Sequence, residues 1–202
     1  IMSKKIAAGA GAIVLDVKVG SGAFMKNMQD AEKLAEEMVK IGSLAGRNTI
    51  AVISDMDEPL GLAVGNALEV AEAVKTLKKE GPEDLINLCL ELGTQMLIAS
   101  KVEENADKAR GMLQNSIDDG SAYNKFLEFI KRQGGDITVF DDLDEFTECN
   151  YKIEVKADKE GYVQRIESEL IGEASMILGG GRITKEDVID YSVGVKLSAK
   201  RG

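Results

Sequence analysis

The sequence contains no histidine among its 202 residues, and this absence excludes several kinds of chemistry. Serine–histidine catalysis, histidine general bases and histidine metal ligands cannot come from this chain. Cysteine is nearly absent as well, since only Cys89 and Cys149 are present. Two cysteines sixty residues apart are typical of reduced thiols in a cytosolic protein and argue against a disulfide framework.

Long apolar runs and an excess of basic residues are also missing. No apolar run approaches the ~20 residues that a membrane-spanning helix needs, and no secretory signal pattern stands at the start. Lys and Arg number 25 against 35 Asp and Glu, which gives a formal net charge of −10. This balance argues against nucleic acid or an anionic membrane as the main partner, although local N–H donors and lysines can still bind a small anion.

The most informative segment is Lys4–Met25, KKIAAGAGAIVLDVKVGSGAFM. The apolar run that begins at Ala12 predicts a buried strand over residues 12–19. The glycines of Gly20-Ser21-Gly22 then predict a tight connection in which backbone can approach a ligand closely. A strand that leads into such a loop and then a helix is how α/β enzymes build sites at the carboxyl ends of their strands.

Hydrophobic periodicity predicts the other elements of an α/β domain. Strand, helix, strand and several helices fit part of a mixed or parallel sheet flanked by helices. Helical spacing is already present at Ile1 and Met2, so the chain is interpreted as a piece of a longer protein. Helices are expected at 1–8 (ended by Gly9 and Gly11), 30–44, 63–79, 83–100, 105–118 and 122–133, a second strand at 49–53, and a turn at 55–61.

The pattern changes near residue 145, where a smaller α+β unit is expected to begin. The alternation of YKIEV at 151–155, followed by the segment 161–166, predicts a β-hairpin. A short helix at 168–178, a glycine loop at 179–181 and a strand at 193–197 are expected to complete the unit.

Several residues can carry chemistry, and each has a purely structural alternative. The Gly20-Ser21-Gly22 segment can cradle a phosphate or a base, but a lone G-x-G often serves only a turn. Asp16 and Lys18 point to the same face of the strand, either as part of a site or as an ion pair within the strand. Lys4 and Lys5 point about 100° apart on a helix, so one can face a cleft while the other is solvated.

The turn around Pro59 and Gly61 offers a second kind of site. Its carbonyls, including those of Leu60 and Ala63, cannot all be satisfied by a regular ladder. Carbonyl oxygens together with one carboxylate are the ligands that a hard cation prefers. Glu72 can supply the carboxylate, although its spacing alone favours a solvated glutamate in the next helix.

Three blocks of the sequence carry a family resemblance: KKIAAGAGAIVLDVKVGSGAFMK, SDMDEPLGLAVGNALEVAEAV, and ILGGGR with DVIDYSVGV. Together they closely resemble the pyrimidine-nucleoside phosphorylase and thymidine phosphorylase family. The resemblance covers essentially the whole chain in order. One departure is Gly11, where the family more often has a longer or acidic side chain.

The resemblance implies a subunit of three parts: a small helical domain, a large α/β domain and a β-rich C-terminal domain. Residues 1–10 would be the tail of the first, 11–147 the second part of the α/β domain, and 148–202 the start of the third. The family's phosphate-binding lysine, serine and threonine, and an arginine and a serine that bind the base, would lie outside this chain. The chain alone is therefore expected to be inactive.

Three residues match substrate-binding positions of the family. Lys4 matches the catalytic, base-binding lysine, in an S-K-K context. Ile1 matches an apolar contact to the pyrimidine, and Phe24 lies in the segment that packs near the base.

Three further residues match the ligands of a structural potassium ion in bacterial members of the family. These are the carbonyls of Leu60 and Ala63 and the carboxylate of Glu72, with two more ligands expected from outside this chain. The resemblance thus favours a metal-binding role for Glu72, where spacing alone did not. No organic cofactor is expected.

The implied reaction is the reversible phosphorolysis of uridine or thymidine by inorganic phosphate, which gives free base and (deoxy)ribose 1-phosphate, in a cytoplasmic homodimer. Two alternatives stay open. A phosphoribosyltransferase of the anthranilate type shares the architecture but needs a diphosphate loop and Mg²⁺-binding carboxylates, and no convincing acidic pair is present. The other is a truncated module that only binds or assembles. The sequence does not decide between uridine and thymidine.

Overall fold

Two parallel strands form the centre of the computed structural model, which describes residues 1–202. Strand β1 (Ala12–Val19) pairs with β2 (Asn48–Asp55) in a register that runs from Ala12 opposite Asn48 to Val19 opposite Asp55. Helix α2 (Met28–Leu44) connects them, as a parallel pair requires a crossover. The predicted α/β class and the bounds of the first strand are confirmed.

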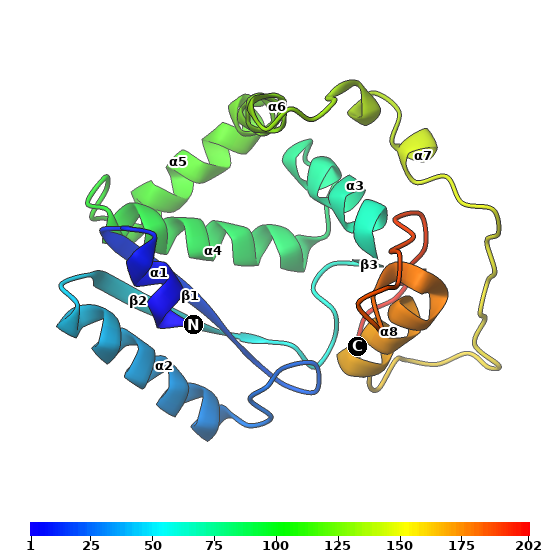
Figure 1. Ribbon diagram of the computed structural model, residues 1–202, viewed down its shortest axis with the longest axis horizontal. Helices are drawn as coiled ribbons and strands as arrows, with labels where there is room; N and C mark the ends of the chain where they lie inside the picture. The colour runs from blue at the N-terminus through cyan, green and yellow to red at the C-terminus, as the bar shows by residue number, and fades with distance from the viewer.

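One face of this sheet carries the main hydrophobic core. Alternate side chains of β1 point toward α1 (Met2–Ala7) and α2, because successive side chains of a strand face opposite ways. Figure 1 shows α1 running back alongside β1, with α2 beside the two strands. The buried members of this cluster are Met2, Ile13, Leu15, Val17, Ala31, Ala35 and Met38.

Helices cover the rest of the α/β part, and local sequence signals fix several of their ends. Helix α4 (Glu83–Ala99) also contacts both strands, and α5 (Ala106–Asp118), α6 (Ser121–Arg132) and α3 (Asn66–Leu77) lie beyond it (Figure 1). The side-chain oxygens of Asn27 and Asn105 accept hydrogen bonds from backbone N–H groups at the starts of α2 and α5. These helices were predicted, with ends that differ by at most three residues. None of the helices has both the length and the apolar character of a membrane-spanning segment.

Two short helical elements after α6 were not predicted. They are the 3₁₀ turn η1 (Thr138–Phe140) and helix α7 (Leu143–Phe146). Phe140 is buried and lies between Phe126 and Phe146, with ring centroids 5.2 and 5.6 Å away. This aromatic contact holds the end of the α/β part together, and it joins residues that a local pattern does not connect.

The C-terminal part corrects several predictions. The hairpin at 151–155 and 161–166 is absent, and Figure 1 shows this segment as a long connection between α7 and α8. The reason is visible in its side chains, since Tyr151, Ile153, Val155 and Tyr162 are all at least 86% exposed and have nothing to pack against. Two strands without such a surface are only marginally stable.

The remaining C-terminal elements are shorter than predicted. Helix α8 covers Ser168–Ser175 and continues into a π-helical turn, η2 (Met176–Gly180), where a longer helix and a glycine loop were expected. Strand β4 (Val195–Lys196) pairs antiparallel with β3 (Ala63–Val64). The prediction that residues 63–65 begin the helix of α3 was therefore wrong, because Ala63 and Val64 pair with β4 and Gly65 precedes the first helical residue, Asn66.

Candidate functional site

The loop that follows β1 is the predicted site, and the structure shows a tightly closed turn there. The N–H of Gly20 donates to the carbonyl of Met25 at 3.0 Å, and the N–H of Ala23 donates to the carbonyl of Gly20 at 3.1 Å. Gly22 donates to the carbonyl of Met56, which follows β2, at 3.0 Å. The loop Gly20–Met25 thus lies at the carboxyl ends of both strands, where α/β proteins place their ligands.

Asp57, which follows β2, holds this loop through two hydrogen bonds. Its Oδ1 accepts a hydrogen bond from the N–H of Ser21 at 2.9 Å, and its carbonyl accepts one from the hydroxyl of Ser21 at 3.0 Å. The sequence analysis assigned Asp57 only to a turn. The contact joins residues 36 positions apart, so no local pattern could have identified it.

The three predicted substrate-binding residues are all exposed. Phe24, at the tip of the loop, is 98% exposed, and Ile1 is 75% exposed. Lys4 lies on α1 and, like its neighbour Lys5, makes no hydrogen bond or ion pair through its ammonium group. The structure therefore leaves a cationic and two apolar side chains free to meet a ligand, and their assignment to substrate binding stays a prediction.

Asp16 and Lys18 form the ion pair that was the structural alternative for them. Lys18 Nζ lies 2.8 Å from Asp16 Oδ2 and donates to the hydroxyl of Ser54 on β2 at 2.9 Å. Ser54 in turn donates to Asp16. These three side chains satisfy one another across the sheet, which explains the pair without a ligand.

The predicted cation residues come together around one turn. Both carboxylate oxygens of Glu72 accept from the N–H of Leu62, at 3.0 and 3.2 Å, and Oε2 also accepts from the N–H of Ala63 at 3.4 Å. Gly61 has a φ of +72°, and a Cβ at this position would lie 2.1 Å from Glu72 Oε2. Glu72 is thus seated on the turn, and the reading of it as a solvated glutamate was wrong.

This turn fits a monovalent cation in the chemistry of its donors. The carbonyl of Leu60 accepts no hydrogen bond within the protein. The two oxygens of the Glu72 carboxylate offer about four lone-pair directions, more than the two N–H groups use. No group of three or more acidic or cysteine side chains is arranged to hold a metal ion, so carbonyls would have to supply most ligands.

A second acidic residue supports the same turn from α4. Asp84 accepts from the N–H of Gly61 at 3.0 Å and pairs with Lys200 at 3.0 Å. Burial pushes the pKa of Asp84 upward, but the hydrogen bonds from Lys200 and Gly61 outweigh this and hold the pKa below its ordinary value. Asp84 is therefore a charged anchor for the turn, which the sequence analysis did not identify.

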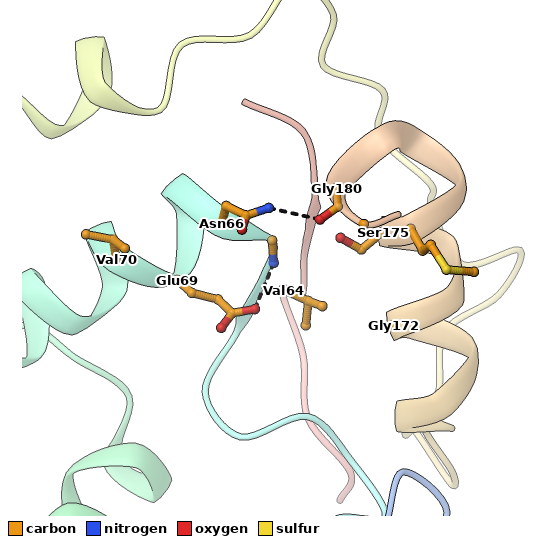
Figure 2. A pocket seen from close by; sticks show the side chains of 10 residues that line it. Val64, Asn66, Glu69, Val70, Gly172, Ser175 and Gly180 are labelled. Atoms are coloured by element: carbon orange, nitrogen blue, oxygen red, sulfur yellow. Dashed lines mark hydrogen bonds between the residues drawn. The ribbon is translucent and has the colours of Figure 1, made fainter. Parts of the chain in front are cut away.

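A cavity of about 380 Å³ lies between the start of α3 and the η2 turn, and none of the predicted site residues lines it (Figure 2). Two of its polar side chains, Asn66 and Glu69, are already hydrogen-bonded to backbone groups. Asn66 Nδ2 donates to the carbonyl of Gly180 at 2.9 Å, and Glu69 accepts from the N–H of Gly65 at 3.0 Å (Figure 2). The N–H of Gly65 at the start of α3 is therefore already bonded to Glu69. The cavity is a packing gap between α3 and the α8–η2 segment.

Ser168, the first residue of α8, is buried against the loop, and its hydroxyl has no hydrogen-bond partner. We expect Ser168→Ala to raise the free energy of unfolding by about 1 kcal/mol, because a buried unsatisfied hydroxyl is removed while the packing is kept. Denaturant unfolding measures this change. A loss of stability would instead mean that the hydroxyl is bonded in solution.

Comparisons with known proteins match two separate parts of the chain. Residues 1–123 match the model of a glycosyl transferase family, a/b domain, and residues 162–202 match the pyrimidine nucleoside phosphorylase C-terminal domain. The chain is similar to the pyrimidine-nucleoside phosphorylases of Staphylococcus aureus strains bovine RF122 / ET3-1 and USA300. Each is 57% identical to it over all 202 of its residues, which correspond to 47% of the relative. The chain therefore spans about half the length of the curated relatives it matches.

Proposed function

Because this chain belongs to the glycosyl transferase family through its a/b domain, we propose that it is part of a pyrimidine-nucleoside phosphorylase. The proposed reaction is the reversible phosphorolysis of uridine or thymidine to free base and (deoxy)ribose 1-phosphate. The observation that carries the proposal is the 57% identity to pyrimidine-nucleoside phosphorylases over the full 202 residues. The match of residues 162–202 to the C-terminal domain of the same enzymes supports it.

Lys4 is proposed to stabilise the departing base. When the glycosidic C–N bond breaks, positive charge develops on the sugar and negative charge on the pyrimidine. An ammonium group hydrogen-bonded to a base carbonyl stabilises that negative charge most when it is largest, so it favours the transition state over the bound substrate. Lys4 is exposed and makes no competing ion pair, and the role needs no histidine.

Phe24 and Ile1 are proposed to supply the apolar contacts that orient the pyrimidine ring. Both are large apolar side chains that face solvent in this structure, at 98% and 75% exposure. A base that covers them removes apolar surface from water, which contributes binding energy at about 25 cal/mol per Å². Phosphate is the nucleophile and carries its own charge, so no side chain of this chain has to activate it.

Leu60, Ala63 and Glu72 are proposed to hold a potassium ion through two carbonyls and one carboxylate. The ion would supply positive charge that neutralises the carboxylate and fixes the turn between β2 and α3. The support is geometric: Glu72 is already seated on the Leu62 and Ala63 backbone, and the Leu60 carbonyl is free. Gly61 leaves the room that this seat requires.

We expect Glu72→Gln to weaken the stabilisation by potassium, because the neutral amide lacks the charge that pairs with the ion. Potassium at ten times its Kd should stabilise the wild type by about 1.4 kcal/mol. The measurement is the melting temperature in potassium chloride and in tetramethylammonium chloride at equal ionic strength. Glu69→Gln is the matched control, since Glu69 lies on the same helix and its carboxylate also accepts a backbone hydrogen bond, from the N–H of Gly65. An equal potassium response in Glu72→Gln and in the wild type would remove Glu72 from the site.

The proposed function is tested by a phosphorolysis assay with uridine and with thymidine. It should be run on this chain and on the natural polypeptide that contains it, with release of free base as the readout. Base release that depends on inorganic phosphate supports the proposal. Activity only with a diphosphorylated sugar would point to a phosphoribosyltransferase, and binding without turnover in the natural polypeptide would point to a non-catalytic module.

The proposed setting is a cytoplasmic homodimer that acts on a nucleoside and inorganic phosphate. Support for the compartment comes from Cys89 and Cys149, which are both free thiols, as expected for a reducing environment. The net charge of −10 favours small-molecule substrates over nucleic acid. The proposal of a dimer is based on the family resemblance. The molar mass of the natural polypeptide in solution tests it.

A further inference from the structure

The first turn of α8 packs directly against the loop Gly20–Met25, although the two are far apart in sequence. Any Cβ at Gly22 would lie 2.6 Å from the Cβ of Ser168 and 3.2 Å from the Cγ of Met56. The φ of Gly22 is not in the left-handed region, so other residues could adopt its backbone conformation. Glycine is therefore required here by the closeness of α8 and Met56.

A second contact joins the same two segments through one ammonium group. Lys26 Nζ donates to the carbonyl of Ser21 at 2.6 Å and to Glu169 Oε2 at 3.1 Å, across 143 residues of sequence. Both side chains of the ion pair are more than half exposed, so the pair contributes little stability. Its relevance is structural, because Lys26 connects the loop backbone at Ser21 to Glu169 at the start of α8.

Asp57 forms a third connection. Besides its bonds to Ser21, its carbonyl accepts from the N–H of Ser168 at 3.4 Å, and its Oδ2 lies 3.7 Å from the guanidinium of Arg201. Arg201 also pairs with Asp55 at 3.0 Å. The C-terminal unit thus contacts the loop and its support from two separate segments.

These contacts bear on Phe24 because that side chain has no packing of its own. It is 98% exposed, while its neighbour Ala23 is 7% exposed and Met25 packs against the main core. The position of the Phe24 ring is therefore set by the backbone of the loop alone. A displacement of about 1 Å in a substrate-positioning group can cost as much as 10²-fold in rate.

We propose that the first turn of α8, through Ser168 and Glu169, is a positioning element for the Phe24-bearing loop and so sets the affinity for the pyrimidine base. This inference rests on the proposed function for the role of Phe24, and on the contacts above for the coupling. It assigns to the C-terminal unit a part in substrate recognition, in addition to its part in the fold. Ser168 and Glu169 act through the loop and do not touch the substrate.

The test is Gly22→Ala in the natural polypeptide that contains this chain. The new methyl group collides with Ser168, so we expect faster hydrogen exchange at the N–H groups of Ser21 and Gly22, which the native loop protects. We expect the KM for the nucleoside to rise about tenfold while the KM for phosphate is unchanged. Unchanged exchange at these two amides would overturn the proposal, and so would an equal rise in both KM values.

Two further variants separate positioning from general damage. Gly172→Ala makes the same change on α8 where no atom lies within 4 Å of the new Cβ, and it should leave exchange and both KM values as in the wild type. The double variant Gly22→Ala with Ser168→Gly removes the Ser168 Cβ with which the new methyl group collides. It should restore part of the protection against exchange and lower the nucleoside KM toward the wild-type value. Failure of this rescue, or an equal effect of Gly172→Ala, would contradict a specific contact.

If Gly22→Ala does not fold, Glu169→Ala tests the same coupling without a collision. It removes the partner of Lys26 from an exposed position, and faster exchange in the loop is again the expected result. Absence of phosphorolysis in the natural polypeptide would defeat the proposed function but not the coupling, because the exchange measurement needs no activity. Native exchange in Glu169→Ala would then reject the coupling itself.

Discussion

Replacing Lys4 with alanine is expected to lower kcat/KM for phosphorolysis by about 1.5 to 3 orders of magnitude, or ~2–4 kcal/mol of transition-state stabilisation. The reason is that a charged donor to the base carbonyl acts mainly when the base carries negative charge. The measurement is steady-state kinetics with uridine and thymidine in the natural polypeptide. Because the interaction strengthens in the transition state, kcat should fall together with kcat/KM.

The structure indicates that Lys4→Ala tests activity without changing stability. The Lys4 side chain is exposed and bonds to nothing, whereas Met2 on the same short helix is buried in the core. Lys4→Ala should therefore leave the free energy of unfolding within about 0.5 kcal/mol of the wild type, as is usual for surface substitutions. A loss of activity without a loss of stability can then be assigned to the chemistry.

Lys5→Ala is the matched control, since Lys5 has the same charge, the same helix and the same exposure. It removes one positive charge from the protein but points about 100° away from Lys4. It should retain near-wild-type activity. Equal losses in the two variants would show that the effect is one of general electrostatics, and full activity in Lys4→Ala would exclude Lys4 from the mechanism.

The sequence was sufficient for most of the α/β part, because the signals there are local. The strand at 12–19 was predicted with its observed bounds from the apolar run that begins at Ala12. Positive-φ glycines end α1 at Gly9 and α2 at Gly46, where glycine has no steric penalty. Each of these signals needs only a few neighbouring residues to act.

The errors lie where distant segments decide the structure. Ala63 and Val64 follow a helical pattern, yet they pair with Lys196 and Val195 in β4. The alternating segment at 151–155 met the local criterion for a strand but has no partner strand in this structure. Strand formation depends on packing against neighbours more than on intrinsic preference, so such segments cannot be judged from the local pattern alone.

The candidate site shows the same division. Its glycine loop and its proline turn were visible as motifs, and the family resemblance supplied roles for six residues. The residues that hold the loop and the turn in place could not be predicted from the sequence. Asp57, Asp84 and Ser168 act through contacts to distant segments of the chain. A motif identifies the backbone that approaches a ligand, whereas the side chains that hold this backbone are found only in three dimensions.

Gly20→Ala is expected to lower the free energy of unfolding by about 3–5 kcal/mol, a large share of the stability of an ordinary domain. Two costs add at this position. Its φ of +131° is a conformation that residues with a side chain rarely adopt. A Cβ would also lie 2.6 Å from the backbone nitrogen of Asp57 and 2.7 Å from the carbonyl carbon of Met56, which cannot rotate away as a side chain can. Denaturant unfolding measures the loss.

Gly46→Ala is a reference for the cost of a positive φ without a collision. Gly46 also has a positive φ, of +71°, but no atom lies within 4 Å of a Cβ placed there. Its replacement should therefore cost only the backbone term, about 1–2 kcal/mol. If Gly20→Ala cost no more than Gly46→Ala, the two strand ends would not be packed as closely as described. A larger loss at Gly20 is expected because its φ is less accessible and because a Cβ there collides with the backbone of Met56 and Asp57. That close backbone contact holds the end of β1, and with it the loop that carries the exposed Phe24, in a defined position.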